Sequence, residues 1–212
     1  MRCIGVYGAS GFGREVLPLV RAQYAGDDTE IRLIDDGITN GDSILSFDEF
    51  IALPHAEKLV TITIANSAIR EKLAACCANA AIGVADILAA NAMVLDDVEI
   101  GEGAILCGFT HLTSNIRIGR HFHANLYSYV SHDCVIGDYV TFAPNVHCNG
   151  NVHIDDHAYI GAGAILKQGT PGKPLKIGRG AIVGMGAVVT KDVEAGNTVI
   201  GNPARPMVTF GR

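Results

Sequence analysis

The chain has 212 residues, 49% of them hydrophobic, which suffices for a buried core and argues against extended disorder. Aromatic residues make up only 6% and glycines number 25, a composition that favours short, tightly turned backbone segments. The net charge of −6 is uneven, because residues 167–212 carry seven basic and two acidic side chains. Such a small basic patch on an acidic chain is a poor match for nucleic acid and a better match for a compact polyanionic ligand.

The N-terminal sequence MRCIGVYGAS has the pattern of a strand that leads into a glycine-rich turn, not that of a signal peptide. No run of 18 or more apolar residues follows it. We therefore expect a cytoplasmic protein without membrane insertion. The six cysteines form no CxxC pair, which favours buried free thiols over a disulfide framework.

Residues 1–86 alternate between strand-like and helix-like patterns. The strand patterns are CIGVYGAS, IRLIDD and LVTITIAN; the helix patterns are GREVLPLVRAQ, SFDEFIAL and SAIREKLAACCANA, the last with Ser67 as its expected cap. Because each strand is followed by a helix, the pattern predicts a small parallel sheet. We expect an abbreviated Rossmann-like α/β domain over residues 1–86.

A six-residue period replaces this alternation in residues 87–212. Aliphatic or small residues recur at every sixth position from Leu88 to Leu166, and after the insertion GTPGKPLK the register resumes at Ile177 and runs to Ala195. An α-helix would drift off such a period. Three hexads make one triangular coil, and coils stack about 4.8 Å apart with strands hydrogen-bonded between them. The pattern predicts a left-handed parallel β-helix, from which Pro171 and Pro174 take the insertion out as a loop.

The coil arithmetic separates one histidine from the other seven. Residues 18 positions apart stack, so His132 lies between Ser114 and Gly150, directly before Asp133. An imidazole can act as general base near neutral pH, the carboxylate can orient it, and the glycine leaves room for a ligand. Other like-placed histidines are two coils apart, about 9.6 Å, which is too far for a shared metal ion. No metal site is expected.

The segments GASGFG, IDD, ITIANSAIR and SHDCVIGDY together resemble the PglD/NeuD-like sugar acetyltransferases, a family of the hexapeptide-repeat, left-handed β-helix acyltransferase superfamily. The resemblance covers nearly the whole chain. It implies acetyl-CoA-dependent N-acetylation of a nucleotide-linked amino sugar, a precursor of bacterial glycans such as O-antigen, by direct attack on the thioester. It also implies a homotrimer that binds acetyl-CoA between neighbouring β-helices.

The same resemblance assigns the site residues. The catalytic pair falls on His132 and Asp133. The nucleotide-sugar residues are Gly8, Ser10, Gly11, Gly13, Asp35, Asp36 and Arg70, with the glycine-rich turn at a helix start suited to a pyrophosphate. The acetyl-CoA residues are Thr141, Gly150, Ala162 and Met185; the basic concentration after Lys167, and not the resemblance, adds Lys173 and Lys176 of the insertion as contacts for the CoA phosphates.

The sequence departs from the family pattern at three positions, of which the first two leave the substrate open. Phe12 stands where a histidine is common, Thr141 replaces a histidine that some relatives aim at the thioester, and Ala65 stands where a glycine is usual. Two alternatives therefore remain. One is O-acetylation of a sialic-acid-like sugar or a serine-type acceptor. The other is a non-catalytic β-helix that serves assembly or small-ligand binding.

Overall fold

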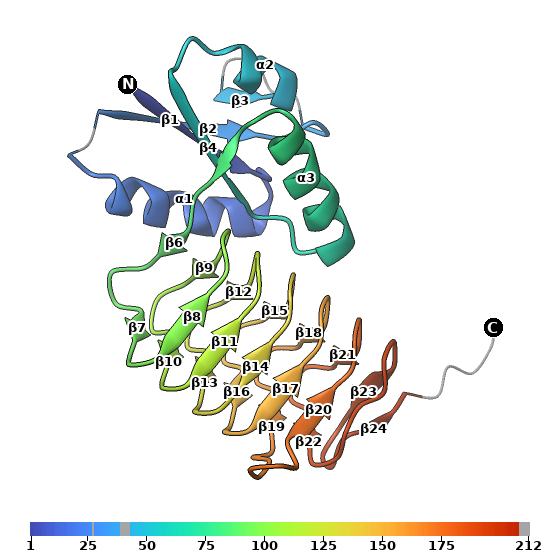
Figure 1. The fold of residues 1–212 in the computed structure, drawn as a ribbon. Helices are drawn as coiled ribbons and strands as arrows, with labels where there is room; N and C mark the ends of the chain where they lie inside the picture. Colours follow the sequence, from blue (N-terminus) through green and yellow to red (C-terminus); the bar gives the residue numbers. More distant parts are fainter. Residues whose placement is uncertain (27, 39–42, 208–212) are drawn as a thin grey trace, which may run out of the picture.

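The computed structural model describes residues 1–26, 28–38 and 43–207, which form an α/β part in contact with a β-helix (Figure 1). The α/β part is a five-stranded, all-parallel sheet in the order β3-β2-β1-β4-β5. Its strands are β1 (Arg2–Tyr7), β2 (Thr29–Ile34), β3 (Ile44–Leu45), β4 (Glu57–Ile62) and β5 (Gly83–Val84). Its helices are α1 (Gly11–Gln23), α2 (Phe47–Ala52) and α3 (Ser67–Asn79). The strand order reverses at β1, as in half of a doubly wound sheet.

The three long strands and the three helices follow the sequence pattern. Strands β3 and β5 were missed, because two residues each are too short to show a period. The cap of α3 is Asn66, whose side chain accepts the Ile69 N–H at 3.0 Å, so the expected Ser67 cap is wrong by one residue. Helix α2 begins with a full capping box between Ser46 and Glu49.

The β-helix has three faces, each a stack of short parallel strands (Figure 1). Face 1 comprises β6 (Ile87–Leu88), β9 (Ile105–Leu106), β12 (His123–Ala124), β15 (Thr141–Phe142), β18 (Tyr159–Ile160), β21 (Ile182–Val183), β23 (Thr198–Ile200) and the antiparallel β24 (Arg205–Pro206). Face 2 comprises β7 (Met93–Val94), β10 (His111–Leu112), β13 (Tyr129–Val130), β16 (His147–Cys148), β19 (Ile165–Leu166) and β22 (Val188–Val189). Face 3 comprises β8 (Val98–Ile100), β11 (Ile116–Ile118), β14 (Val135–Ile136), β17 (Val152–Ile154) and β20 (Leu175–Ile177).

The hexad positions from Leu106 to Val189 are buried, which confirms the predicted core of the β-helix. The two ends differ from the prediction. Leu88 and Val94 are each 38% exposed, because the first coil has no coil beneath it. Ala195 is exposed because the last coil is shorter, so that Val193 instead pairs with Ile177.

The three faces meet at corners, which we number by the faces they follow. The first corner joins faces 1 and 2, the second joins faces 2 and 3, and the third joins faces 3 and 1. The second corner repeats a left-handed residue in successive coils, with φ of 53° at Asn115 and 59° at Asp133. Asp and Asn tolerate this conformation better than most residues, which explains their recurrence here.

The α/β part rests on face 1 and the third corner through a shared apolar core. That core combines Val6 of the sheet and Val16 of α1 with Ile87 and Ile105 of the first coils. Polar contacts surround it, such as the buried His123 Nε2 at 3.0 Å from the Ile62 carbonyl oxygen. The two parts thus pack as one body. Within the described residues, the helices lack the combination of length and apolar character that a bilayer span needs.

Candidate active site

His132 and Asp133 form a close pair at the second corner. The imidazole Nδ1 lies 2.6 Å from Asp133 Oδ2, and both side chains are about half exposed (47% and 41%). In the neutral imidazole, a hydrogen on Nδ1 donates to this carboxylate and leaves the lone pair of Nε2 available to accept a proton. Hydrogen bonds from His132 and then from Asn115 lower the pKa of Asp133. The pair has the geometry of an oriented general base.

Gly150 lies directly against the imidazole in the next coil. A Cβ atom at this position would come within 2.5 Å of His132 Cε1 and 2.6 Å of Nε2. The absence of a side chain at Gly150 therefore makes room for the His132 ring, and the contact of Gly150 with acetyl-CoA stays a prediction.

A basic pocket lies farther along the second corner, toward the C-terminal end of the β-helix. It has a volume of about 580 Å³ and is lined by Lys167, Lys173 and Lys191 together with the insertion loop. The loop tip is a tight turn in which Thr170 and Lys173 exchange two backbone hydrogen bonds. Lys167 and Lys191 stand two and three coils beyond His132, roughly 10 and 14 Å at the strand spacing.

The predicted acetyl-CoA residues do not gather in one place. Lys173 lines the basic pocket, whereas Lys176 is the exposed middle residue of β20 on face 3. Ala162 and Met185 lie one coil apart at the first corner, where the Gly186 N–H donates to the Ala162 carbonyl and Met185 is 82% exposed. Lys167 and Lys191 were not among the predicted acetyl-CoA residues. Counting stacked positions would have found Lys167, two coils after Ser131, and, with allowance for the insertion, Lys191.

Arg70 is fully buried between the two parts of the chain. Its guanidinium donates to the carbonyls of Ile64 and Ala65 and, through Nη2, to the Tyr139 carbonyl at 2.6 Å and Thr141 Oγ1 at 3.0 Å. Burial lowers the pKa of Arg70 to about 10. Nη1 and Nη2 are thus turned toward protein oxygens inside the fold, and the contact of Arg70 with the nucleotide-sugar stays a prediction.

Thr141 accordingly belongs to the same junction. Its side chain is 5% exposed and forms part of a pocket of about 450 Å³ between the start of α3 and face 1. This pocket is distinct from the basic pocket at the second corner. The structure therefore separates Thr141 from the other predicted acetyl-CoA residues.

The glycine-rich turn connects the end of β1 to α1 at the carboxyl edge of the sheet. Gly8 has φ of 117°, and a Cβ atom on Gly13 would meet the Gly8 carbonyl oxygen at 1.7 Å, so both glycines are required by the backbone. Gly11 has open space around its Cβ position. Ser10 is the N-cap of α1 but leaves its hydroxyl outside a capping hydrogen bond. The turn thus presents an open helix start of the kind that binds phosphate.

Asp35 and Asp36 lie beside this turn, as the sequence analysis expected. Asp35 Oδ2 accepts the Ala9 N–H at 2.9 Å, and Asp36 accepts the Phe47 N–H at 2.9 Å and the Tyr7 hydroxyl. A carboxylate oxygen can accept further hydrogen bonds. The structure therefore brings the turn and the acidic pair into one crevice at the carboxyl ends of the strands, the usual ligand position in such sheets.

The glycine-rich turn and His132 lie at different corners within one chain. The α/β part contacts the third corner, at Tyr139, whereas His132 stands at the second corner. One side of the triangle, roughly 16 Å for five residues, separates these corners. A single chain thus holds the predicted nucleotide site and the predicted base apart.

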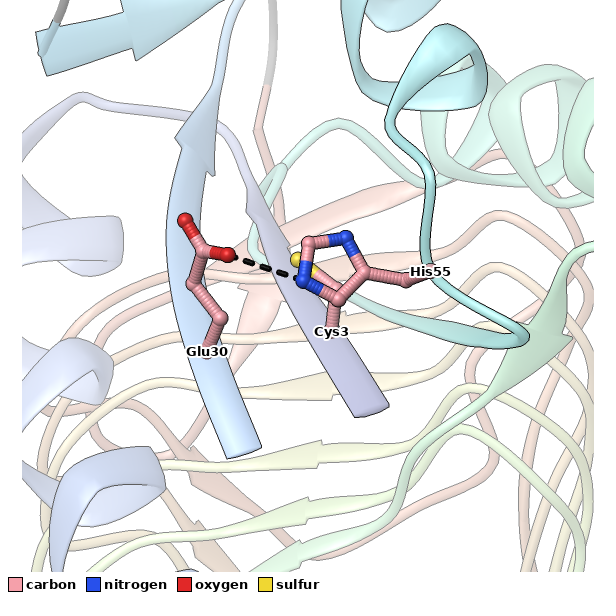
Figure 2. Close-up of side chains that lie close together, drawn as sticks. All are labelled: Cys3, Glu30 and His55. Atoms are coloured by element: carbon pink, nitrogen blue, oxygen red, sulfur yellow. Dashed lines mark ion pairs between the residues drawn. The ribbon is translucent and has the colours of Figure 1, made fainter. Parts of the chain in front are cut away.

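One group of metal-binding side-chain types occurs among the described residues: Cys3, Glu30 and His55 (Figure 2). Their candidate ligand atoms lie within 4.8 Å of one another. His55 Nε2 is 2.8 Å from Glu30 Oε2, and Arg32 pairs with the same carboxylate. Burial raises the pKa of Cys3 to about 11, which disfavours the thiolate that a metal needs. The ion pair accounts for the cluster, and it lies at the sheet edge opposite the glycine-rich turn.

Comparisons with known proteins agree with this architecture over the full length. A family model described as bacterial transferase hexapeptide (six repeats) matches residues 133–168. GDP-perosamine N-acetyltransferase from Escherichia coli O157:H7 is 47% identical, over 98% of this chain and 97% of the relative.

Two solved structures extend the likeness to three dimensions. WeeI from Acinetobacter baumannii AYE is 60% identical with a TM-score of 0.94, covering 98% of this chain and 100% of that one. The acetyltransferase domain of PglB from Neisseria gonorrhoeae FA1090, solved in complex with acetyl coenzyme A, is 27% identical with a TM-score of 0.84, covering 97% and 98%. Both the α/β part and the β-helix are therefore shared with these proteins.

Proposed function

Because the chain belongs to the hexapeptide-repeat sugar acetyltransferase family, we propose that it transfers the acetyl group of acetyl-CoA to the amino group of a GDP-linked amino sugar. The relative from E. coli is named for GDP-perosamine, which makes that compound the first acceptor to test. The observation that carries the proposal is the His132–Asp133 pair, 2.6 Å apart at the corner that also holds the basic pocket.

The reaction needs one base and no metal. The amine attacks the thioester carbonyl carbon while Nε2 of His132 accepts the proton that the nitrogen loses. The tetrahedral intermediate then collapses, the C–S bond breaks, and the imidazolium returns the proton to the departing CoA thiolate. Asp133 stabilises the imidazolium through Nδ1 and does not itself transfer the proton.

Acetyl-CoA would lie along the second corner with its thioester at His132. The phosphates of CoA are at the far end of the pantetheine arm, so they would reach the lysines of the basic pocket. Ala162 and Met185 would complete the site from the first corner of a neighbouring chain. This arrangement fits a homotrimer in which each second corner faces the next chain's first corner.

The exposed apolar side chains of the first corner support such an assembly. Phe109 and Tyr127 stack at 4.9 Å and are 48% and 57% exposed, and Leu126 beside them is 42% exposed. An exposed apolar strip of this kind is typical of a surface that another chain covers. Light scattering that gives the mass of three chains would support the trimer; a mass near 22.3 kDa would overturn it and the shared site with it.

The nucleotide end of the acceptor would bind the α/β part, which we interpret as a Rossmann-like domain over residues 1–86. Its pyrophosphate fits the open start of α1, and Asp35 or Asp36 would accept hydrogen bonds from the base or ribose. Residues 87–212 would form the acetyl-CoA-binding, catalytic part, which we take to wind left-handed. Both substrates are intracellular metabolites, which supports a cytoplasmic location.

Incubation of the purified protein with acetyl-CoA and a panel of acceptors tests this function. The panel should contain GDP-perosamine, UDP- and dTDP-linked 4-amino sugars, a sialic-acid-like sugar and serine. We expect CoA release with a GDP-linked amino sugar and a product whose acetyl group is on nitrogen. A product acetylated on oxygen would show that the acceptor is a hydroxyl and not an amine. If none of the acceptors on the panel causes CoA release, the sugar assignment is rejected.

A further inference from the structure

The Asp133 carboxylate has a second partner besides His132. Nδ2 of Asn115 donates to Asp133 Oδ1 at 2.6 Å, while His132 Nδ1 donates to Oδ2, also at 2.6 Å. Each oxygen of the carboxylate is thus held by a different side chain. Asn115 stands 18 residues before Asp133, one coil lower at the same corner, which is the sequence signal that would have found it.

We propose that Asn115 is a positioning residue for acetyl transfer, which fixes the Asp133 carboxylate and through it the imidazole of His132. The proposal rests on the proposed function, because it takes His132 as the base. The terminal torsion of an aspartate is broad, so a carboxylate held through one oxygen can rotate. A hydrogen bond on the other oxygen fixes its plane and therefore the direction in which His132 presents Nε2.

The amide also favours the charged form of Asp133. A donor that points at a carboxylate oxygen stabilises the anion. The negative charge in turn stabilises the imidazolium that forms when His132 takes the proton of the amine. Asn115 thus acts on both the geometry and the charge of the pair without touching either substrate.

A plain backbone role is the competing explanation, because Asn115 has φ of 53° and asparagine tolerates the left-handed region. Asp97 occupies the same corner one coil lower with φ of 55° and provides a matched control. Glycine adopts this conformation without strain. Asn115→Gly therefore keeps the backbone conformation and removes the side chain with its amide.

The kinetic test compares Asn115→Gly with Asp97→Gly in the acetyl-transfer assay. We expect Asn115→Gly to lower kcat about three- to tenfold, the value of one hydrogen bond, with both KM values within about twofold. Asp97→Gly should leave kcat in place. In an Asp133→Ala background, Asn115→Gly should have no further effect. A kcat that Asn115→Gly leaves intact, an equal loss in Asp97→Gly, or an additive loss in the Asp133→Ala background would each overturn the proposal.

A titration without substrates separates this proposal from the proposed function. The Asp133 carboxyl carbon can be followed by NMR and assigned by its absence in Asp133→Ala. Asn115→Gly should raise the pKa of Asp133, because the carboxylate loses a donor. An unshifted titration would contradict the contact, whereas a wild-type protein inactive with every acceptor would contradict only the acetyltransferase assignment.

Discussion

Nη2 of Arg70 donates to the Tyr139 carbonyl at 2.6 Å, which ties α3 of the α/β part to the third corner of the β-helix. The same nitrogen bonds Thr141 Oγ1, and the side chain is fully buried. Replacing Arg70 leaves the buried Tyr139 carbonyl oxygen and the part-buried Ile64 and Ala65 carbonyl oxygens without this donor, and an unsatisfied buried acceptor costs about 1–3 kcal/mol. The contact is therefore expected to matter for stability and not for chemistry.

We predict that Arg70→Met lowers the free energy of unfolding by about 2–4 kcal/mol, measured by urea denaturation. Thr141→Val, which removes only one partner of the guanidinium, should cost about 1 kcal/mol. Where Arg70→Met remains folded, its KM for the nucleotide-sugar should match that of the wild type. A raised KM in a protein of normal stability would support the predicted contact of Arg70 with the nucleotide-sugar.

Replacing the predicted base should abolish most of the activity and leave the fold in place. His132→Ala should lower kcat roughly 10²–10⁴-fold. Asp133→Asn should cost less, since Asp133 orients the ring and does not transfer the proton. Circular dichroism and melting temperature serve as controls, and activity of His132→Ala within a few-fold of wild type would rule out the assignment.

The closeness of Gly150 to the imidazole gives a separate prediction. Gly150→Ala places a methyl group 2.5 Å from His132 Cε1, so the ring must turn away from Asp133. We expect at least a tenfold loss of kcat with a modest change in melting temperature. Gly163→Ala gauges the effect of backbone strain alone, because the Cβ position of Gly163 is open while its φ of 68° disfavours alanine. Equal effects of the two changes would point to the backbone and not to His132.

Lysines inside and outside the basic pocket should differ in their effect on the KM for acetyl-CoA. Charge reversal of Lys173 and Lys191 to Glu should raise the KM for acetyl-CoA about tenfold or more and weaken its dependence on salt. Lys176→Glu, on face 3 outside the pocket, should leave this KM within about twofold. If Lys176→Glu instead gave the larger effect, CoA would have to follow face 3.

Two substitutions in the glycine-rich turn distinguish a role in binding the nucleotide-sugar from a role in the fold. A Cβ atom on Gly11 would meet no protein atom within 4 Å, so Gly11→Val should raise the KM for the nucleotide-sugar with little effect on that for acetyl-CoA. Gly13→Ala should instead destabilise the protein, because its Cβ would collide with the Gly8 carbonyl oxygen. Steady-state kinetics and thermal melting of both variants check this. An unaltered sugar KM in Gly11→Val would leave the turn with a structural role only.

The sequence by itself determined the β-helix and its stacking, because each hexad is a local rule that repeats with the coil. The rule that residues 18 positions apart stack holds for His123 and Thr141, and for the column of His121, Tyr139 and His157, whose rings stack at 5.2 and 5.3 Å. The same arithmetic placed His132 against Gly150. The sequence pattern did not predict the strands β3 and β5, which are too short to show a period, or the pairing in the last coil, where the six-residue period ends.

Only the tertiary structure decided how the α/β part packs on the β-helix and which residues form that contact. No local pattern marks Arg70 as buried, because its oxygen partners at Tyr139 and Thr141 are about 70 positions away and belong to another periodicity. The positions of Lys173 and Lys176 likewise depend on how the insertion loop folds. Lys173 lines the basic pocket, and Lys176 lies on face 3. A repeat of neighbouring residues can be recognised in the sequence, whereas contacts between the α/β part and the β-helix depend on how the two parts pack against each other.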